Sequence, residues 1–287
     1  MTDRIIRVQA HAKINWCLAV TGRDAHGYHL LDMLMQRVSL YDTLSAAPGE
    51  ALSLRIAGDP VGCAPEKNLV LRAARALQAR YGVTRGARLT LVKRIPQGAG
   101  MGGGSSDAAA ALKALCRLWG LRPEPQALGE LALSIGADVP FFLHGTPARV
   151  QGIGERLTPA ALPGQVPLVL FKLTEGLSTA EVYAESDRCP QPPIRVEALA
   201  DCLSERDFVR AQALTGNALY PAALRLQPGL ETAKRAVEES GALYSLMTGS
   251  GAVVYGVFAT SRQALDAAER LRNDFPGAYA ACATTLS

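Results

Sequence analysis

The sequence predicts an α+β protein with two lobes. Strand-like segments come first along the chain, and helical segments then interleave with strands unevenly. Such uneven mixing favours separate regions of sheet and helix over a regular alternation of the two. A loose, proline-rich stretch at 185–196 has the composition of a linker, and 287 residues are enough for two modest domains.

The first third of the chain is expected to be mostly sheet. Loose alternation of apolar and polar residues predicts one or two strands over 4–20, and a polar turn follows at 22–32. Helical spacing predicts a helix in EKNLVLRAARALQARYG, which Gly82 can end. Further strands are expected in QRVSLYDTLSAAP, ALSLRIAG and RLTLVKRIP, the last of which stops at Pro96.

The rest of the chain mixes both element types. Helices are expected at about 106–119, 124–136, 197–215, 228–240 and 262–274. Strands are expected in VPFFLHG, PARVQGIGERLTPA, PLVLFKL and, as a pair, around LYSLMTGSGAVVYGVFA.

Composition narrows the class of protein. Apolar residues make up 48% and charged residues 20%, which is ordinary for a globular chain. The net charge of +4 fits a small anionic substrate, and no run of Lys and Arg suggests a nucleic-acid-binding arm. No apolar stretch approaches the roughly 20 residues of a membrane span, and the N-terminus lacks the pattern of a signal peptide. Six cysteines without paired spacing and four histidines argue against a zinc site and predict reduced thiols in a cytoplasmic protein.

Five glycines fall within positions 98–104, between a predicted strand and a predicted helix. Glycine loses more conformational freedom on folding than any other residue, so five glycines in one loop require a structural or functional explanation. A strand, a glycine loop and a helix form an anion-binding arrangement, because the first-turn N–H groups lack helical partners and the helix dipole places about half a positive charge there. Ser105 and Ser106 can cap the helix, contact phosphate or bind Mg²⁺.

Three ligand-binding interpretations compete for this loop. Gly98, Gly100 and Gly103 satisfy the dinucleotide pattern G-x-G-x-x-G, but no strand ending in an acid is clear about 20 residues further on. A Walker P-loop would need a lysine where Gly104 precedes Ser105. The third is a phosphate-holding loop of another kind, with its charged groups supplied from elsewhere. A flexible linker is disfavoured between a strand and a strong helix.

The segment PQGAGMGGGSSD, at 96–107, resembles the central motif of the GHMP kinases, small-molecule kinases with a Pro-x-x-x-Gly-Leu-Gly-Ser-Ser-Ala loop. It departs from that motif with Met101 for leucine and Asp107 for alanine. The segments at 12–44 and 134–157 are similar to GHMP kinases that act on a cytidine diphosphate substrate. GLSTAEVY and LMTGSGAVVYGVF continue the similarity in order, so the resemblance covers nearly the whole chain.

The resemblance implies a fold and a reaction. The fold would have an N-terminal α/β lobe over 1–155 that carries the glycine loop, a C-terminal α+β lobe over 156–287, and the active site in the cleft. The reaction would be ATP-dependent phosphorylation of the 2-hydroxyl of a cytidine diphosphate derivative in the non-mevalonate route to isoprenoid precursors.

The resemblance also implies that Lys13 and Asp138 are the catalytic pair. Lys13 would keep the Asp138 carboxylate ionised, orient the substrate hydroxyl and offset charge on the transferring phosphoryl group. Alternation over HAKIN places Lys13 and Asn15 on one face of a strand and Ala12 and Ile14 on the other. A carboxylate is too weak to deprotonate a free alcohol beforehand, so positioning should supply more of the rate. Taken alone, Asp138 could also be a cap or turn former.

Substrate-binding residues are carried over in the same way. They are Asn15, Tyr28, His29, Thr179 and Tyr183. A cytosine ring is expected between Tyr28 and Tyr183, with His29 bonding its polar edge, and such stacking contributes roughly 1–3 kcal/mol per base. Core packing of Tyr183 and an ordinary surface role for His29 are the alternatives.

The implied cofactors are ATP and Mg²⁺. The ATP phosphates are expected on Pro96, Gln97, Gly98, Ala99, Gly100, Met101, Gly102, Gly103, Gly104, Ser105 and Ser106. Asn68 and Lys93 are expected to line the adenine side. TGSG at 248–251 is expected to pack a second glycine turn near the loop, and Asp107 to complement the helix dipole. No carboxylate ligand for Mg²⁺ is assigned.

Two other functions stay open at this point. One is a GHMP kinase for a sugar, homoserine or mevalonate, against which the GYH and STAEVY segments argue. The other is a nucleotide-binding regulator without catalysis, against which the presence of both Lys13 and Asp138 argues. The expected partners are ATP and a small cytidine diphosphate substrate, with no nucleic acid and no membrane, for a monomer or weak homodimer.

Overall fold

A computed structural model describes residues 5–58, 67–189 and 194–287 of the chain. Its contacts divide the chain into two compact units. The first unit takes in Met1–Ala12, Leu40–Gln97 and Gly102–Gly145, and the second takes in Lys13–Ser39, Gly98–Met101 and Thr146–Ser287. The glycine loop therefore contributes residues to both units. A division into lobes at residue 155 stays a prediction.

Helices and strands contribute to both units. Two long strands have residues in each unit, and they are β1 (Ile6–Arg23) and β2 (His29–Gly49). The first unit also holds β3 (Leu52–Gly58), α1 (Leu69–Tyr81), β4 (Gly86–Lys93), α2 (Gly103–Trp119), α3 (Pro125–Ile135) and α4 (Val139–His144). The second unit holds β5 (Ala148–Gly152), β6 (Arg156–Pro159), β7 (Pro167–Lys172), α5 (Thr179–Ser186), α6 (Val196–Ser204), α7 (Phe208–Leu214), α8 (Tyr220–Leu226), α9 (Gly229–Glu239), β8 (Tyr244–Met247), β9 (Val254–Val257), α10 (Ser261–Asp274) and β10 (Tyr279–Thr284).

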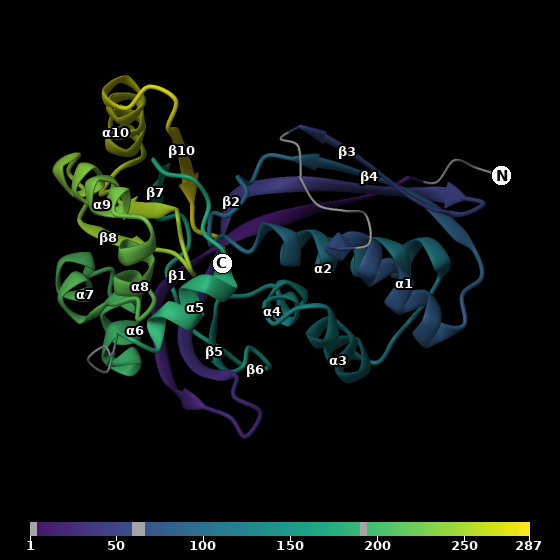
Figure 1. Cartoon of the computed structure of the whole chain (residues 1–287). Coiled ribbons are helices and arrows are strands. Elements are labelled where there is room, and N and C mark those ends of the chain that lie inside the picture. The colour runs from purple at the N-terminus through teal and green to yellow at the C-terminus, as the bar shows by residue number, and fades with distance from the viewer. Residues whose placement is uncertain (1–4, 59–66, 190–193) are drawn as a thin grey trace. The chain divides into compact units, whose positions relative to one another are not determined.

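The sheet of the first unit is built around β4. This strand runs parallel to β3 and antiparallel to the C-terminal part of β2, where Thr43 lies opposite Val92. The helices α1 and α2 pack on each other, and Figure 1 shows both on the same side of β3 and β4. Residues 108–111 of α2 are all alanine and at most 2% exposed, because their small methyl groups let neighbouring elements approach the helix closely.

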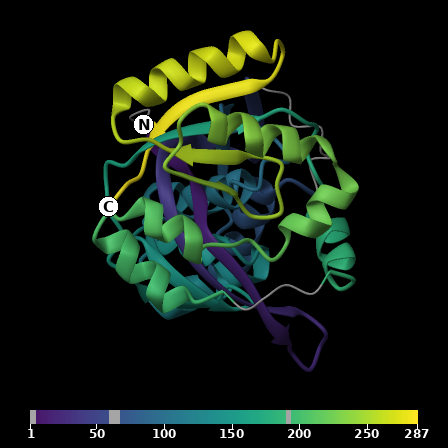
Figure 2. The ribbon, with the colours of Figure 1, turned by 90° about the vertical axis from the view of Figure 1, so that its left-hand side faces the viewer.

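In the second unit, four antiparallel strands form a sheet in the order β10-β7-β9-β8. Figure 2 shows α10 beside β10, and α9 packs on β8 and β9. In the same unit β5 pairs with the N-terminal part of β2, from Leu31 opposite Gly152 to Met35 opposite Ala148, and β6 pairs with β5.

An aromatic cluster anchors β1 in the second unit. The Trp16 side chain is fully buried, with its ring centroid 5.3 Å from that of Tyr244 and 6.0 Å from that of Tyr255. The indole N–H donates to Gln36 Oε1 at 2.7 Å, so its one polar atom is satisfied inside the core. This cluster holds rigid the stretch of β1 that follows Lys13.

The α+β class is confirmed by the mixed helix and strand content and the two sheets. One expected strand is wrong, because VPFFLH forms the helix α4. A six-residue apolar run has no period that distinguishes strand from helix. Pro140 lies in the first turn of α4, where its missing N–H costs nothing, and Gly145 ends the helix in a left-handed conformation.

The helix expected over 197–215 is two helices, α6 and α7. Arg206 lies between them with φ of 59°, which breaks the helical path. The Asp207 side chain then accepts from the backbone N–H of Arg210 at 3.0 Å and starts α7 as an N-cap. The helices α5 and α8 and the strand β10 were not expected from the sequence.

The expected linker at 185–196 overlaps the end of α5 and the start of α6, and residues 190–193 lie outside the described part of the chain. Over the described residues, no helix combines the length and the apolar character that a bilayer crossing requires. The five cysteines in that part are free thiols, and Cys63 lies outside it.

Candidate active site

Lys13 is buried, and its ammonium group holds the glycine loop. The residue lies on β1 and is 3% exposed. Its Nζ donates to the carbonyl oxygen of Gly100 at 2.6 Å and to Asn15 Oδ1 at 2.5 Å. The Lys13 backbone N–H donates to the carbonyl oxygen of Met101 at 3.0 Å. A buried ammonium needs acceptors in place of water. Two acceptors of Lys13 are a carbonyl oxygen of the loop and the side chain of Asn15 on its own strand.

Asn15 joins β1 to the TGSG turn. Its Oδ1 accepts from the backbone N–H of Gly249 at 2.9 Å and from Thr248 Oγ1 at 3.2 Å, in addition to Lys13. The side chain is 1% exposed. Asn15 therefore positions Lys13, and its predicted contact with substrate stays a prediction.

The second glycine turn, 248–251, packs directly on the loop, which confirms the expectation for TGSG. The carbonyl oxygen of Gly98 accepts from the backbone N–H of Ala252 at 2.9 Å. Gly100 has φ of +68°, and a Cβ atom there would lie 2.0 Å from the carbonyl oxygen of Thr248. Gly98 is restricted in the same way, with φ of +56° and a Cβ position 2.5 Å from the Cα atom of Gly176, so close backbone packing requires both of these loop glycines.

The helix α2 begins at Gly103, inside the loop and not near Ser106. Gly102 is the N-cap, with φ of 67° and no side-chain hydrogen bond to the first turn. Ser105 and Ser106 lie within that turn, so neither caps the helix, and their contact with phosphate or Mg²⁺ stays a prediction. Since no described side chain caps it, the first turn presents backbone N–H groups and the positive end of a 17-residue helix to an anion.

A buried ion-pair cluster lies under the start of α2. The Lys93 Nζ donates to Asp107 Oδ2 at 2.7 Å and also to Asp42. The other Asp42 oxygen accepts from the backbone N–H of Ile95 at 2.9 Å. Burial raises the pKa of Asp107 to about 7, against the lowering effect of Lys93 and with a further rise from Asp42. Two carboxylates thus share one ammonium, and protonation of Asp107 makes the cluster neutral.

The structure gives partners to three of the predicted residues, and two of them, Asp107 and Lys93, belong to this cluster. Asp107 lies beyond the first turn and is bound to Lys93, so the expected dipole-complementing role is wrong. Lys93 is 7% exposed and is held by Asp42 and Asp107. Asn68 caps α1, with its Oδ1 accepting from the backbone N–H of Val70 at 2.9 Å. Contact of Lys93 and Asn68 with adenine stays a prediction.

Asp138 lies between α3 and α4 in the first unit. Its backbone is helical, it occupies the N-cap position of α4, and its side chain caps nothing. Gly136 before it is extended, so α3 ends and the chain turns into α4 at this residue. Of the two alternatives to a catalytic role, the side-chain cap is therefore absent and the place in a turn is present, and the residue is partly exposed. Lys13 belongs to the second unit, so the proximity of Lys13 and Asp138 stays a prediction.

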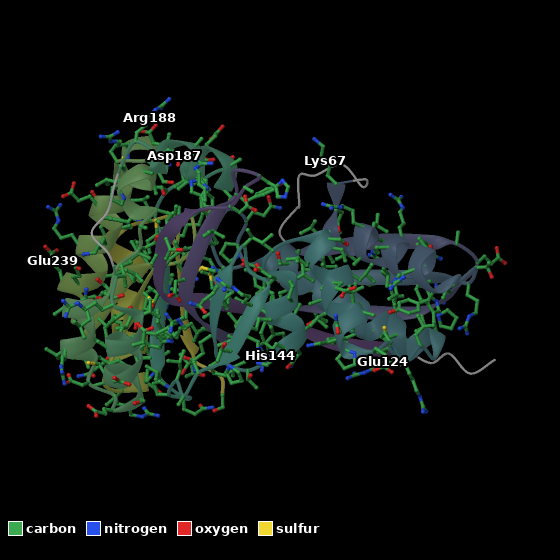
Figure 3. All side chains as sticks on the ribbon, turned by 90° about the horizontal axis from the view of Figure 1, so that it is seen from below. Lys67, Glu124, His144, Asp187, Arg188 and Glu239 are labelled. Atoms are coloured by element: carbon green, nitrogen blue, oxygen red, sulfur yellow. The ribbon has the colours of Figure 1, made fainter. Side chains whose placement is uncertain are left out.

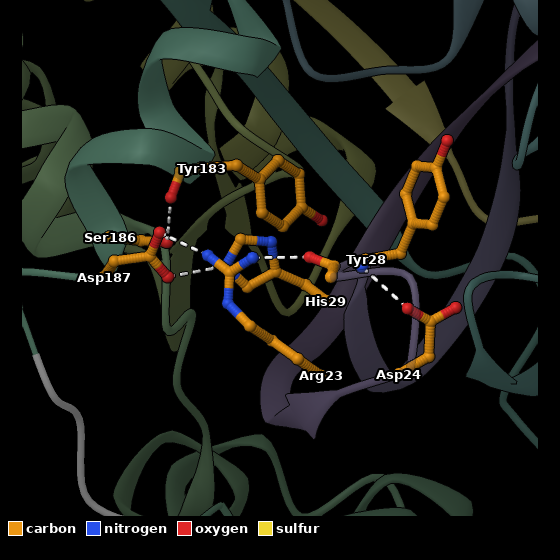
Figure 4. A network of polar contacts seen from close by, with 8 residues as sticks. Arg23, Asp24, Tyr28, His29, Tyr183, Ser186 and Asp187 are labelled. Atoms are coloured by element: carbon orange, nitrogen blue, oxygen red, sulfur yellow. Dashed lines mark hydrogen bonds and ion pairs between the residues drawn. The ribbon is translucent and has the colours of Figure 1, made fainter.

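Two of the predicted base-binding residues, His29 and Tyr183, meet where the β1–β2 hairpin faces α5, both in the second unit. Figure 4 shows His29 beneath the Tyr183 ring, with ring centroids 4.9 Å apart and planes tilted by 37°. His29 Nε2 lies 2.8 Å from Asp187 Oδ1, and Arg23 pairs with the other oxygen of Asp187. Asp187 lies at the surface of the unit (Figure 3). The Tyr28 side chain is 64% exposed, so its face is open to a ligand.

The structure does not place an aromatic ring of Tyr28 against that of Tyr183 or His29, so the cytosine sandwich stays a prediction. Thr179, at the first position of α5, lies 2.9 Å from Ser250 between their hydroxyl oxygens. This contact connects α5, which carries the predicted substrate residues Thr179 and Tyr183, to the TGSG turn, and through that turn to the part of the glycine loop that lies in the second unit.

Several residues of these networks were missed from the sequence. They are Arg23, Asp42 and Asp187. Asp42 and Asp187 lie 51 and 158 positions from the partners that define them, Lys93 and His29. No local spacing encodes such pairs. The sequence offered only an acidic residue, Asp42, within a predicted strand, and the structure shows that this residue is buried.

Comparison with known proteins identifies the class that this fold and loop define. A family model described as GHMP kinases N terminal domain matches residues 68–146, and one described as GHMP kinases C terminal matches 198–277. The chain belongs to the GHMP kinase family.

Its curated relatives carry a more particular name. A protein from Paramagnetospirillum magneticum named 4-diphosphocytidyl-2-C-methyl-D-erythritol kinase is 40% identical, over 98% of this chain and 98% of the relative. Proteins of the same name from Pelotomaculum thermopropionicum and Cereibacter sphaeroides are 40% and 43% identical, each over 93% of this chain.

Solved structures agree. A crystal structure of 4-(cytidine 5'-diphospho)-2C-methyl-D-erythritol kinase has a TM-score of 0.82 and 36% identity, and covers 98% of this chain and 100% of that one. A homoserine kinase from Cytophaga hutchinsonii has a TM-score of 0.75 at 18% identity, with 100% of this chain and 96% of that chain covered, which shows the shared fold alone.

Proposed function

We propose that this chain transfers the γ-phosphate of ATP to the 2-hydroxyl of 4-diphosphocytidyl-2-C-methyl-D-erythritol, a step toward isoprenoid precursors. The observation that carries the proposal is the 40% identity, over 98% of both chains, to a relative of that name. Homoserine and mevalonate kinases share the fold at 18% identity, which does not favour their substrates here.

The phosphates of ATP would bind the loop Pro96–Ser106. Support comes from the start of α2, which has a left-handed glycine at its N-cap and no side-chain cap. Such a helix end stabilises an anion through free N–H groups and the helix dipole. The Lys13 ammonium, bound to Gly100, adds a fixed positive charge to the same loop. Asn68 and Lys93 would lie toward the adenine side.

Asp138 would orient the acceptor hydroxyl and receive its proton. Its carboxylate has no capping role, and the turn between α3 and α4 holds its backbone. Lys13 would offset negative charge on the transferring phosphoryl group. A carboxylate is far less basic than an alkoxide, so the proton would move late, and most of the rate would come from alignment of the hydroxyl with the phosphorus.

Magnesium fits this chain as an ion carried by ATP. The described residues hold no cluster of three acidic, histidine or cysteine side chains that could bind a metal. Nucleotide-bound Mg²⁺ keeps most of its ligands from phosphate and water and needs one or two protein oxygens. The Ser106 hydroxyl, in the first turn of α2, is the oxygen we assign. When bound, the ion neutralises phosphate charge.

The cytidine end of the substrate would bind at the hairpin and α5. Tyr28 and Tyr183 would stack on the base, and His29 would form a hydrogen bond with its polar edge. Thr179 and Asn15 would make further contacts with the substrate. Support comes from the contact between His29 and Tyr183 and from the exposed face of Tyr28. We further propose a cytoplasmic location, which the free thiols of the described cysteines support, and a monomer or weak homodimer.

The test is an assay of ADP release with ATP, Mg²⁺ and the cytidine diphosphate substrate. Turnover with this substrate supports the proposal. Preferential turnover of galactose, homoserine or mevalonate would assign the chain to another branch of the family. Binding of ATP without turnover of any alcohol would mean that the chain is a nucleotide-binding regulator.

A further inference from the structure

We infer that Asp187 is a positioning residue of the base site, because it holds His29 as the tautomer with the proton on Nε2 and leaves Nδ1 as an acceptor for the amino group of cytosine. The identity of the base rests on the proposed function. The pairing of the two side chains is a property of the second unit alone.

The geometry divides the Asp187 carboxylate between two partners. Oδ1 lies 2.8 Å from His29 Nε2, and Oδ2 pairs with the Arg23 guanidinium. Another nitrogen of Arg23 donates to the carbonyl oxygen of Gly27 (Figure 4). Arg23 thus links Asp187, at the C-terminal end of α5, to the hairpin that carries His29. Asp187 is 41% exposed, so this pair contributes little to stability and its effect is on orientation.

The carboxylate decides which nitrogen of His29 carries the proton. Hydrogen bonds from Arg23 and then from His29 lower the pKa of Asp187, so the carboxylate is ionised at neutral pH and can only accept. The Nε2 atom must therefore donate. A neutral imidazole has one ring proton, so Nδ1 has a lone pair and is an acceptor. Within the described residues, no hydrogen bond to Nδ1 of His29 occurs.

The ring is also restrained on its face and through its backbone. Tyr183 lies against it at 4.9 Å between centroids, and Ser186 Oγ donates to the Tyr183 carbonyl oxygen at 2.8 Å. Asp24 accepts from the backbone N–H of Tyr28 at 2.8 Å and so sets the turn that leads into His29. Edge, face and backbone restraints together fix the imidazole in one orientation.

An acceptor at this position suits cytosine and disfavours uracil. Cytosine carries an exocyclic amino group, which donates, where uracil carries a carbonyl oxygen, which accepts. With uracil, the Nδ1 acceptor of His29 would face a carbonyl oxygen, and neither atom would have a hydrogen-bond donor. Sites built around a hydrogen bond reject an analogue that cannot form it. We expect the wild type to prefer the cytidine over the uridine form of the substrate by at least about tenfold in kcat/KM.

The first measurement needs no substrate. Nitrogen NMR of the ¹⁵N-histidine-labelled full chain at pH 8, with His29→Gln to assign its signals, reports which ring nitrogen is protonated. The expected result is a single tautomer with hydrogen on Nε2 in the wild type and a mixture in Asp187→Leu. Asp187→Asn, which keeps an acceptor oxygen, should retain the wild-type tautomer. Glu185→Gln is the matched control, since Glu185 of α5 pairs with Arg188 and Arg225 instead.

The second measurement is the kinetics of the same variants. Asp187→Leu should raise KM for the cytidine substrate about tenfold, change kcat less than twofold and reduce the preference over uridine, and Asp187→Asn should restore most of both. A mixed or Nδ1-protonated tautomer in the wild type, or kinetics of Asp187→Leu equal to wild type, would overturn the inference. Inactivity of the wild type on the cytidine substrate would overturn the proposed function and, with it, the assignment of cytosine as the base that His29 binds. The NMR result would still decide whether Asp187 sets the tautomer of His29.

Discussion

The ammonium nitrogen of Lys13 lies 2.6 Å from the carbonyl oxygen of Gly100, 87 positions further along the chain. This contact links the middle of the first strand to the glycine loop in one unit. It brings a positive charge to a loop that has no lysine of its own, so under the proposed function Lys13 would stand in for the Walker lysine.

Replacement of Lys13 by methionine should therefore remove catalysis more than stability. We expect kcat/KM to fall about 10²–10³-fold, the range for loss of one charge-stabilising donor. The control is Lys113→Met, which also removes an ammonium bound to a backbone carbonyl, that of Phe142, at 2.7 Å. Steady-state rates and thermal melts of both variants are the measurement. Equal rates for the two variants would contradict the role of Lys13.

Asp138→Asn should abolish turnover and leave ATP binding largely intact. A general base contributes typically about 10²–10⁴-fold, and we expect a fall in kcat of that size. Glu124→Gln, an exposed acid just before α3, is the control. The rates are followed by ADP release and the binding of ATP by calorimetry. A near-normal rate in Asp138→Asn would show that the base has been assigned wrongly.

Gly100→Ala should destabilise the second unit. The residue has φ of +68°, and a Cβ atom would lie 2.0 Å from the Thr248 carbonyl oxygen, so the variant carries both strain and a clash. Gly277→Ala is the matched control, since its φ is +89° and nothing lies within 4 Å of its Cβ position. Left-handed strain alone costs on the order of 1–3 kcal/mol. We expect a larger loss of unfolding free energy at Gly100 in urea titrations, and equal losses would refute the packing argument.

The raised pKa of Asp107 predicts a pH dependence of stability. Burial lifts this pKa from 3.8 to about 7, so between these values the folded state binds a proton that the unfolded state has released. The contribution of Asp107 to the free energy of unfolding must then fall as pH rises from about 4 to 7, by roughly 1 kcal/mol per pH unit.

Asp107→Asn, which has no titrating group, should lack this slope. Urea unfolding of the wild type and the variant between pH 5 and 8 is the measurement, with Glu130→Gln, an exposed acid of α3, as control. We expect the difference in unfolding free energy between wild type and Asp107→Asn to change with pH in favour of the variant at pH 8. A difference that does not vary with pH would contradict the assigned pKa.

Local sequence patterns predicted much of the secondary structure. Helical spacing predicted α9 and α10 to within about two residues and α1 to within three, because the core-facing residues of these helices recur at the helical period. The segments RLTLVKRIP and PLVLFKL were also predicted correctly as strands, and they contain β4 and β7. The short apolar run VPFFLH and the long segment 197–215 went wrong, since a run of six has no period and a single left-handed residue, Arg206, divides a helix without any change in composition.

The amino-acid sequence by itself determined the α+β class, the glycine loop before α2, and the residues Lys13, Asp138, His29 and Tyr183 as candidates. Only the tertiary structure decided what these side chains contact. It placed Lys13 on Gly100, gave His29 its partner Asp187, and bound Lys93 to two acids. Hydrogen bonds and ion pairs form between atoms a few ångströms apart in space, and separations of tens to hundreds of residues leave no periodic signal along the chain.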